Sequence, residues 1–254
     1  DFHNDDLFNL TLSHTVNWIN DSGAYWRNEL QFGHNRYFES VFHQPFSTVD
    51  NWFAEARIRY ERTPFNVYSD DDAALASSAT KELSAHLSLG WDCGRSGRIQ
   101  LNAGYMDIRY DTILGMNDAH EKQALPYAGV SFDFDTLDNI SFPRKGFRLK
   151  GEYRRTRDDL THDFDKNYYL FEGVLPVALG RDWSLVFSGK YGRSYCGDLF
   201  ELGGAFNLSG SPYSRYTGNR LYFGRVTALY SASELMSQLG MPVYLGATYE
   251  MGRA

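Results

Sequence analysis

Apolar and polar residues alternate along most of this chain, and this alternation restricts the possible folds more than any other feature. From Ala54 to Glu61 the even positions are apolar and the odd positions carry charge. Successive side chains of a β-strand point to opposite faces, so the pattern predicts strands with one apolar and one polar face. Helical periodicity is nearly absent, and the predicted class is all-β.

The alternating segments are long. We predict about eleven strands, near residues 6–20, 24–44, 50–68, 80–91, 98–111, 126–137, 145–158, 165–178, 182–195, 219–232 and 242–252. Many exceed the roughly five or six residues of a soluble strand. They match the roughly 9–11 residues that cross a bilayer at a tilt.

The connections between these strands fall into two sets. One end of the sheet receives short turns such as ALGRD, residues 178–182, and the other receives longer, more acidic loops such as SDDDAALASSATK, residues 69–81. Short turns at one end and long loops at the other are typical of outer-membrane β-barrels.

A soluble sandwich or ligand-binding barrel also alternates, because one face packs on a core and the other meets water. The polar faces favour the membrane barrel, since their charges suit a wet lumen. The residues predicted to face the lumen are Glu55, Arg57, Arg59, Lys150 and Glu152. Those predicted to face lipid are Leu83, Leu87, Phe132, Leu149 and Leu245. Tryptophans also recur near strand ends, as interfacial girdles require.

Composition excludes several other classes. The net charge of -7 argues against a nucleic-acid partner, which needs a basic face. The two cysteines, Cys93 and Cys196, show no zinc-site spacing, and we predict no metal and no cofactor. We expect them at opposite ends of the barrel and therefore not joined in a disulfide. The chain contains no GxSxG motif, so we predict no catalytic residues in it.

The segment FDFDTLDNISFPRKGFRLKGEY, residues 132–153, resembles the strand–turn–strand signature of the Omp85 superfamily. Its turn residues are Asp138, Phe142, Pro143 and Gly146. Proline fixes φ and glycine permits the tight turn into the next strand. The resemblance implies a transmembrane β-barrel of the 16-stranded type. Here we expect an incomplete barrel, with further strands chiefly after residue 254 and one or two before Asp1.

A second segment that resembles the same superfamily lies at residues 197–218. It resembles the long loop that in Omp85 proteins folds back into the lumen and presents an Arg-Gly tip. The tip here is Leu208, Ser209 and Gly210, with serine where the superfamily usually has arginine. We expect its apolar residues to pack against the inner wall, and Gly210 to need a positive φ.

The loop lacks the tip arginine, so another cation is expected to reach the wall. We predict that Arg215 approaches Glu250, directly or through water. The alternative is that Arg215 is solvated and that Phe206, Leu208 and Tyr213 hold the loop, since exposed ion pairs contribute little.

The stretches LGGAFNLSG and LGMPVYLGATYEMG are similar to the C-terminal barrel of patatin-like phospholipase autotransporters, the type Vd secretion proteins. This resemblance covers essentially the whole chain, 1–254. It implies one partial barrel domain, without the lipase and POTRA regions that precede the barrel in such proteins. The implied function is an outer-membrane translocator that anchors or exports a fused passenger polypeptide.

Three alternatives remain open: the barrel of an outer-membrane protein assembly factor of the BamA/TamA kind, a passive porin, and a soluble ligand-binding barrel. The translocator interpretation predicts a location in the bacterial outer membrane. Its partners would be outer-membrane lipid and lipopolysaccharide and a passenger or client polypeptide, with a homo-oligomer also possible.

Overall fold

A computed structural model describes residues 8–33, 35–68, 74–114, 121–157, 166–195, 200–212, 214–232 and 243–254. Twelve strands form one antiparallel sheet in the order β1-β2-β3-β4-β5-β6-β7-β8-β9-β10-β13-β14, and β11 and β12 form a separate pair. The strands of the large sheet are β1 (Asn9–Val16), β2 (Tyr25–Gly33), β3 (Arg36–Pro45), β4 (Trp52–Tyr68), β5 (Ala74–Asp92), β6 (Gly97–Leu114), β7 (Glu121–Asp135), β8 (Arg148–Thr156), β9 (Lys166–Leu179), β10 (Trp183–Ser194), β13 (Arg220–Ser231) and β14 (Tyr244–Arg253). The small pair is β11 (Phe200–Leu202) and β12 (Tyr216–Gly218).

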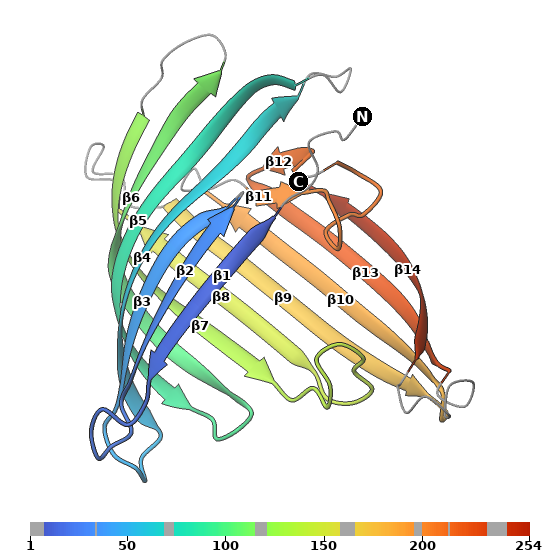
Figure 1. Cartoon of the computed structure of the whole chain (residues 1–254), viewed down its shortest axis with the longest axis horizontal. Helices are drawn as coiled ribbons and strands as arrows, with labels where there is room; N and C mark the ends of the chain where they lie inside the picture. Colours follow the sequence, from blue (N-terminus) through green and yellow to red (C-terminus); the bar gives the residue numbers. More distant parts are fainter. Residues whose placement is uncertain are drawn as a thin grey trace.

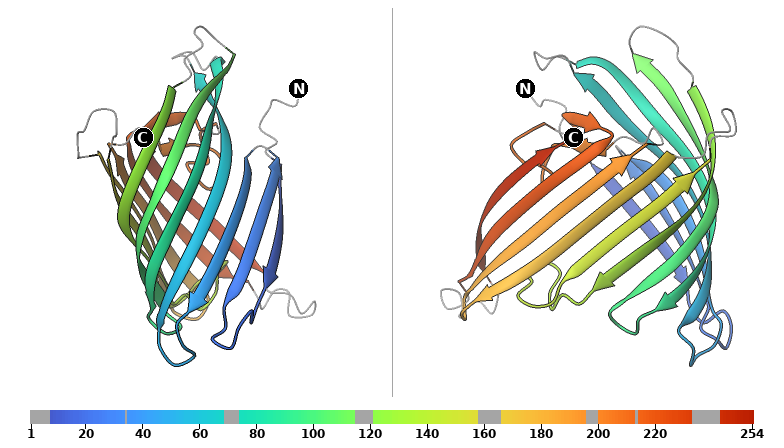
Figure 2. Two further views of the ribbon diagram at one scale, coloured as in Figure 1. Left: turned by 90° about the vertical axis from the view of Figure 1, so that its left-hand side faces the viewer. Right: turned by 180° about the vertical axis from the view of Figure 1, so that it is seen from behind.

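The large sheet curls into a barrel wall that stays open (Figures 1 and 2). Its two edges are β1 and β14, which do not pair with each other. This agrees with the expectation that the strand containing Tyr249 would not close the ring against the first strand. Within the described residues no helix is long and apolar enough to cross a membrane.

The predicted strand near residues 24–44 is wrong, because the chain reverses inside it and forms β2 and β3. The backbone of Gly33 has a φ of +130°, and a Cβ there would lie 2.0 Å from the carbonyl oxygen of Phe8. The reversal is so short that the alternation continues through it, which hides the turn from a pattern analysis. The sheet therefore has an even number of strands, twelve, among the described residues.

The two faces of the sheet differ as the alternation predicts. Leu83, Leu87, Leu149 and Leu245 are exposed on the outer face, with Leu87 at 67%. Phe132 is half-buried, because its ring lies 6.1 Å from that of Phe134 and 6.3 Å from that of Phe171. An outer face of exposed leucine and aromatic side chains is suited to lipid.

All five tryptophans lie at one end of the sheet, which we call the turn end because it carries the short connections. They are Trp18 in the β1–β2 connection, Trp26 in β2, Trp52 at the start of β4, Trp91 near the end of β5 and Trp183 at the start of β10. Trp52 and Trp91 meet edge to face at 4.9 Å. Tryptophan favours the membrane–water interface, so this ring marks one boundary of the apolar band.

Candidate functional site in the lumen

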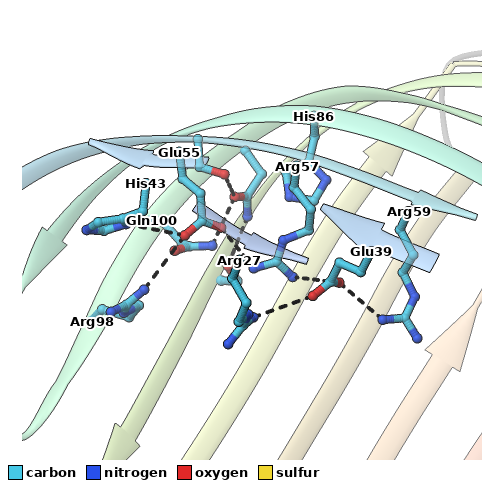
Figure 3. A network of polar contacts seen from close by, with 12 residues as sticks. Arg27, Glu39, His43, Glu55, Arg57, Arg59, His86, Arg98 and Gln100 are labelled. Carbon is cyan, nitrogen blue, oxygen red and sulfur yellow. Dashed lines mark hydrogen bonds and ion pairs between the residues drawn. The ribbon is translucent and has the colours of Figure 1, made fainter. Parts of the chain in front are cut away.

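Charged side chains from β2, β3, β4 and β6 converge on the inner wall around two buried glutamates (Figure 3). The carboxylate of Glu39 lies 3.1 Å from Arg59, 3.5 Å from Arg27 and 3.7 Å from Arg57. Arg27 lies on β2, and Arg57 and Arg59 lie on β4, the two strands beside β3. One carboxylate thus joins three cations, and a carboxylate this buried is tolerated only with such partners.

The second glutamate, Glu55, is only 3% exposed. Its carboxylate lies 2.8 Å from Arg57, 3.4 Å from the Nδ1 atom of His43 and 3.9 Å from Arg98. The imidazole of His43 is stacked on the ring of Tyr25 at 4.7 Å and lies 4.5 Å from the tilted ring of Phe53. The predicted lumen residues Glu55, Arg57 and Arg59 therefore lie in one inner-wall network.

The other predicted lumen charges belong to a second group, on β7 to β10. Asp133, Lys150, Glu172 and Lys190 are direct register neighbours across four strands, with alternating sign. The ammonium of Lys150 lies 3.0 Å from Asp133, and that of Lys190 lies 3.5 Å from Glu172. The predicted residue Glu152 lies two positions after Lys150 on β8, and its carboxylate lies 3.0 Å from Arg154. The inner wall is therefore polar, with balanced charge.

The long loop between β10 and β13 lies against this wall, with β11 and β12 at its root. Phe200 and Leu202 of β11 are buried in a cluster with Tyr168, Leu221 and Phe223, which project inward from β9 and β13. Two wall glycines make room for them. A Cβ at Gly192 would lie 2.6 Å from the Phe200 ring, and one at Gly252 would lie 2.7 Å from Leu202.

The loop tip is held by polar contacts to a pair of wall residues. Arg225 of β13 donates to Glu250 of β14 at 2.7 Å, and the two are register neighbours. The N–H of Ser209 donates to Glu250 at 2.5 Å, and Arg225 donates to the carbonyl oxygen of Phe206. Both tip contacts use backbone atoms of the loop. We call Arg225, Glu250 and these two backbone groups the tip lock.

The tip lock differs from the expected Arg215–Glu250 pair. Arg225 supplies the cation at Glu250, because it faces that carboxylate across the β13–β14 ladder. The guanidinium of Arg215 instead lies 5.8 Å from the ring of Tyr216. The serine at the tip still reaches the wall, because its backbone N–H donates to Glu250.

Two further expectations about the loop need correction. Phe206 was expected to pack, but its side chain is 80% exposed, while Leu208 does lie against the apolar root. Gly210 was expected to need a positive φ, but Phe206 and Leu208 adopt it, at 62° and 80°. Tyr213, also expected to hold the loop, lies outside the described residues.

The turn motif between β7 and β8 forms a tightly bonded connection. The carboxylate of Asp138 accepts the N–H groups of Arg144 and Lys145 at 2.8 and 3.0 Å. These hydrogen bonds lower the pKa of Asp138. Gly146 has a φ of +86°, and a Cβ there would lie 2.0 Å from the carbonyl oxygen of Thr136. Pro143 is buried and Phe142 is half-buried.

The site residues that the sequence analysis missed are Arg27, Glu39, His43, Arg98 and Arg225. Each sits at an inward position of an alternating strand, and that signal could have suggested a lumen location. Their partners depend on register, which alternation does not give. Among the described residues no group of three or more His, Cys, Asp or Glu side chains could bind a metal ion. Cys93 is a free thiol, and Cys196 lies outside the described part of the chain.

No protein-family profile and no curated protein sequence matches the chain. Solved structures do. BamA from Haemophilus ducreyi, in a form lacking POTRA domains 1–3, matches 96% of this chain and 54% of its own, with a TM-score of 0.71 and 14% identity. CdiB from Acinetobacter baumannii matches 96% of this chain and 49% of its own, with a TM-score of 0.53 and 12% identity. The chain spans about half the length of each.

These likenesses define the class of fold as an outer-membrane β-barrel. It is the fold that the resemblance of the two sequence motifs to the Omp85 superfamily implies. The distinctive parts of this chain within that fold are the polar inner wall, the inward-folded loop and the tip lock.

Proposed function

We propose that this chain forms an insertion or translocation barrel in the bacterial outer membrane, with a loop that occludes the lumen at rest. One observation carries the proposal: the loop is fixed to the inner wall both by its apolar root and by its tip lock. A passive porin would need an open lumen. A polar wall with balanced charge suits a polypeptide that crosses or enters the membrane.

Conductance in planar lipid bilayers tests this proposal. The intact protein should conduct weakly, and a variant with a short glycine–serine linker in place of residues 203–215 should conduct strongly, because β11 and β12 remain paired while the tip is gone. Strong conductance with the loop intact would favour the porin. Partition into water without detergent would favour a soluble barrel.

The finer proposal concerns the polypeptide that is handled. We propose a fused passenger of the patatin-like phospholipase type, exported or anchored by the barrel, which would itself have no enzymatic role. The resemblance of the loop stretch LGGAFNLSG and of the stretch around Glu250 to type Vd barrels supports it. The second candidate is assembly of client outer-membrane proteins, which the fold likeness to BamA favours.

The two candidates differ in what lies before Asp1 and at the cell surface. A Gly-x-Ser-x-Gly lipase region upstream, cleaved by protease added to intact cells, is the result expected for a passenger barrel. Tandem POTRA repeats alone, together with loss of other barrel proteins from the membrane on depletion, would favour the assembly factor. Contact with outer-membrane lipid and lipopolysaccharide is common to both.

A further inference from the structure

The turn between β7 and β8, residues 136–147, is built more rigidly than a connection of two neighbouring strands requires. The carboxylate of Asp138 accepts two backbone N–H groups, and the side-chain oxygen of Asn139 accepts those of Ser141 and Phe142 at 2.9 Å each. Neighbouring strands can be joined by two residues. The extra residues therefore form a fixed shape that projects from the turn end.

This shape brings Phe142 onto β14. The rings of Phe142 and Tyr244 are stacked, with centroids 3.9 Å apart and an angle of 8° between their planes. Along the sheet, β8 and β14 are separated by β9, β10 and β13. Four interstrand spacings of about 4.8 Å give roughly 19 Å. The Phe142–Tyr244 contact thus crosses the turn end of the barrel wall and joins elements that are not neighbours in the sheet.

A second attachment lies between these two points. The guanidinium of Arg144 donates to the carbonyl oxygen of Gly180, in the β9–β10 turn, at 2.8 Å. The adjacent Pro143 is buried, although it belongs to a connection at the end of the sheet. The turn is therefore attached both to the β9–β10 turn, through Arg144, and to β14, through Phe142.

We propose that this turn is a clasp that fixes β14 relative to the middle of the sheet. Among the strands that the structure describes, β14 is hydrogen-bonded to β13 alone. At the turn end, the Phe142–Tyr244 stack adds a contact to that ladder. The same strand carries Glu250, so the clasp also sets the wall that receives the loop tip. The inference does not depend on what the barrel transports.

Distance measurement between two spin labels tests the clasp. The labels are placed at Ile140→Cys in the turn and Leu245→Cys beside Tyr244, both exposed positions, in the intact protein with Cys93→Ser and Cys196→Ser. With the clasp in place the distance distribution should be narrow. Phe142→Ala should broaden it and shift it to longer distances, because the turn no longer contacts β14.

Three variants act as controls. Tyr244→Phe keeps the stacked ring and should leave the distribution narrow, and Phe147→Ala removes an exposed ring from the same connection and should do the same. Phe142→Leu keeps apolar volume without an aromatic face and should broaden it, which decides the matter if Phe142→Ala does not fold. Narrow distributions in every folded Phe142 variant would overturn the clasp, as would equal broadening by Phe147→Ala.

Discussion

The root of the inward loop is attached to the wall by apolar packing, and its tip is attached to the same wall by hydrogen bonds. At the root, Leu202 is fully buried, and Phe200 is nearly so, among apolar residues of the wall. At the tip, Phe206 and Ser209 are exposed, and the contacts are hydrogen bonds to Arg225 and Glu250. Apolar burial is lost only when the root leaves the wall, whereas the tip lock can exchange its partners with water.

This difference suggests a division of roles. We expect the root to act as the anchor, and the tip to open while the root stays in place. Backbone groups of the loop make both of these contacts, and the lock is therefore sensitive to the two wall residues that receive them.

The largest expected effect comes from the root. Leu202→Ala should lower the free energy of unfolding by about 2–5 kcal/mol, because it leaves a cavity in a closely packed cluster. Thermal unfolding in lipid vesicles, followed by the loss of the heat-resistant folded form, measures it. Phe206→Ala is the matched control in the same loop and should cost less than about 0.5 kcal/mol, since its ring is exposed. Equal losses in the two variants would contradict the anchor.

The tip lock should give the next effect. Arg225→Gln and Glu250→Gln should each raise conductance while the root remains docked, because either change removes a charged hydrogen bond worth about 1.5–3 kcal/mol. A double-mutant cycle should show coupling between them. The cycle of Arg215→Gln with Glu250→Gln should be additive. Coupling in the second cycle, without coupling in the first, would restore Arg215 as the partner of Glu250.

The sequence could predict the two faces of the wall but not this lock. Alternation places Arg225 and Glu250 on the inner face without stating which residues are opposite each other. Their pairing follows from the β13–β14 register, in which Arg225 faces Glu250. Register depends on turn geometry and packing, and a shift of two residues preserves the alternation while changing every partner.

The backbone conformation of the loop also could not be predicted from the sequence. Phe206 and Leu208 adopt positive φ because local hydrogen bonds fold the segment. The N–H of Gly203 donates to the carbonyl of Asn207 at 2.7 Å, and that of Gly204 to Ser211 at 2.9 Å. Glycine is the usual residue for such angles, which is why Gly210 was the natural prediction. Gly203 and Gly204 do adopt them.

The stability of the loop root is expected to depend on pH, and this dependence offers a further test of the comparison. Burial raises the pKa of Glu201 in β11, and the negative charge of Glu61 acts in the same direction. Below the ordinary value near 4.3 both the folded and unfolded states are protonated. As the pH rises, the unfolded chain ionises first, so stability falls until the raised folded pKa is passed.

The expected result is a root that is more stable in acid than at neutral pH. Glu201→Gln should remove this part of the pH dependence and leave the rest. Unfolding temperatures of the two proteins, measured across that pH range, provide the check. Parallel profiles would show that Glu201 ionises equally in both states.

The smallest effect is expected at Gly210, where the tip resembles an ordinary exposed loop. Its φ is not in the left-handed region, and a Cβ there would meet no atom within 4 Å. Gly210→Ala should therefore change the free energy of unfolding by less than about 0.5 kcal/mol and leave conductance unchanged. Gly203 in the same loop is the matched glycine, with a φ of +129° and a Cβ position 2.1 Å from the carbonyl oxygen of Pro212. Gly203→Ala should destabilise the loop by more than about 1 kcal/mol, because the native angle is incompatible with a side chain. Comparable losses at both positions would mean that the tip is as tightly constrained as the root, and the distinction between anchor and releasable tip would fail.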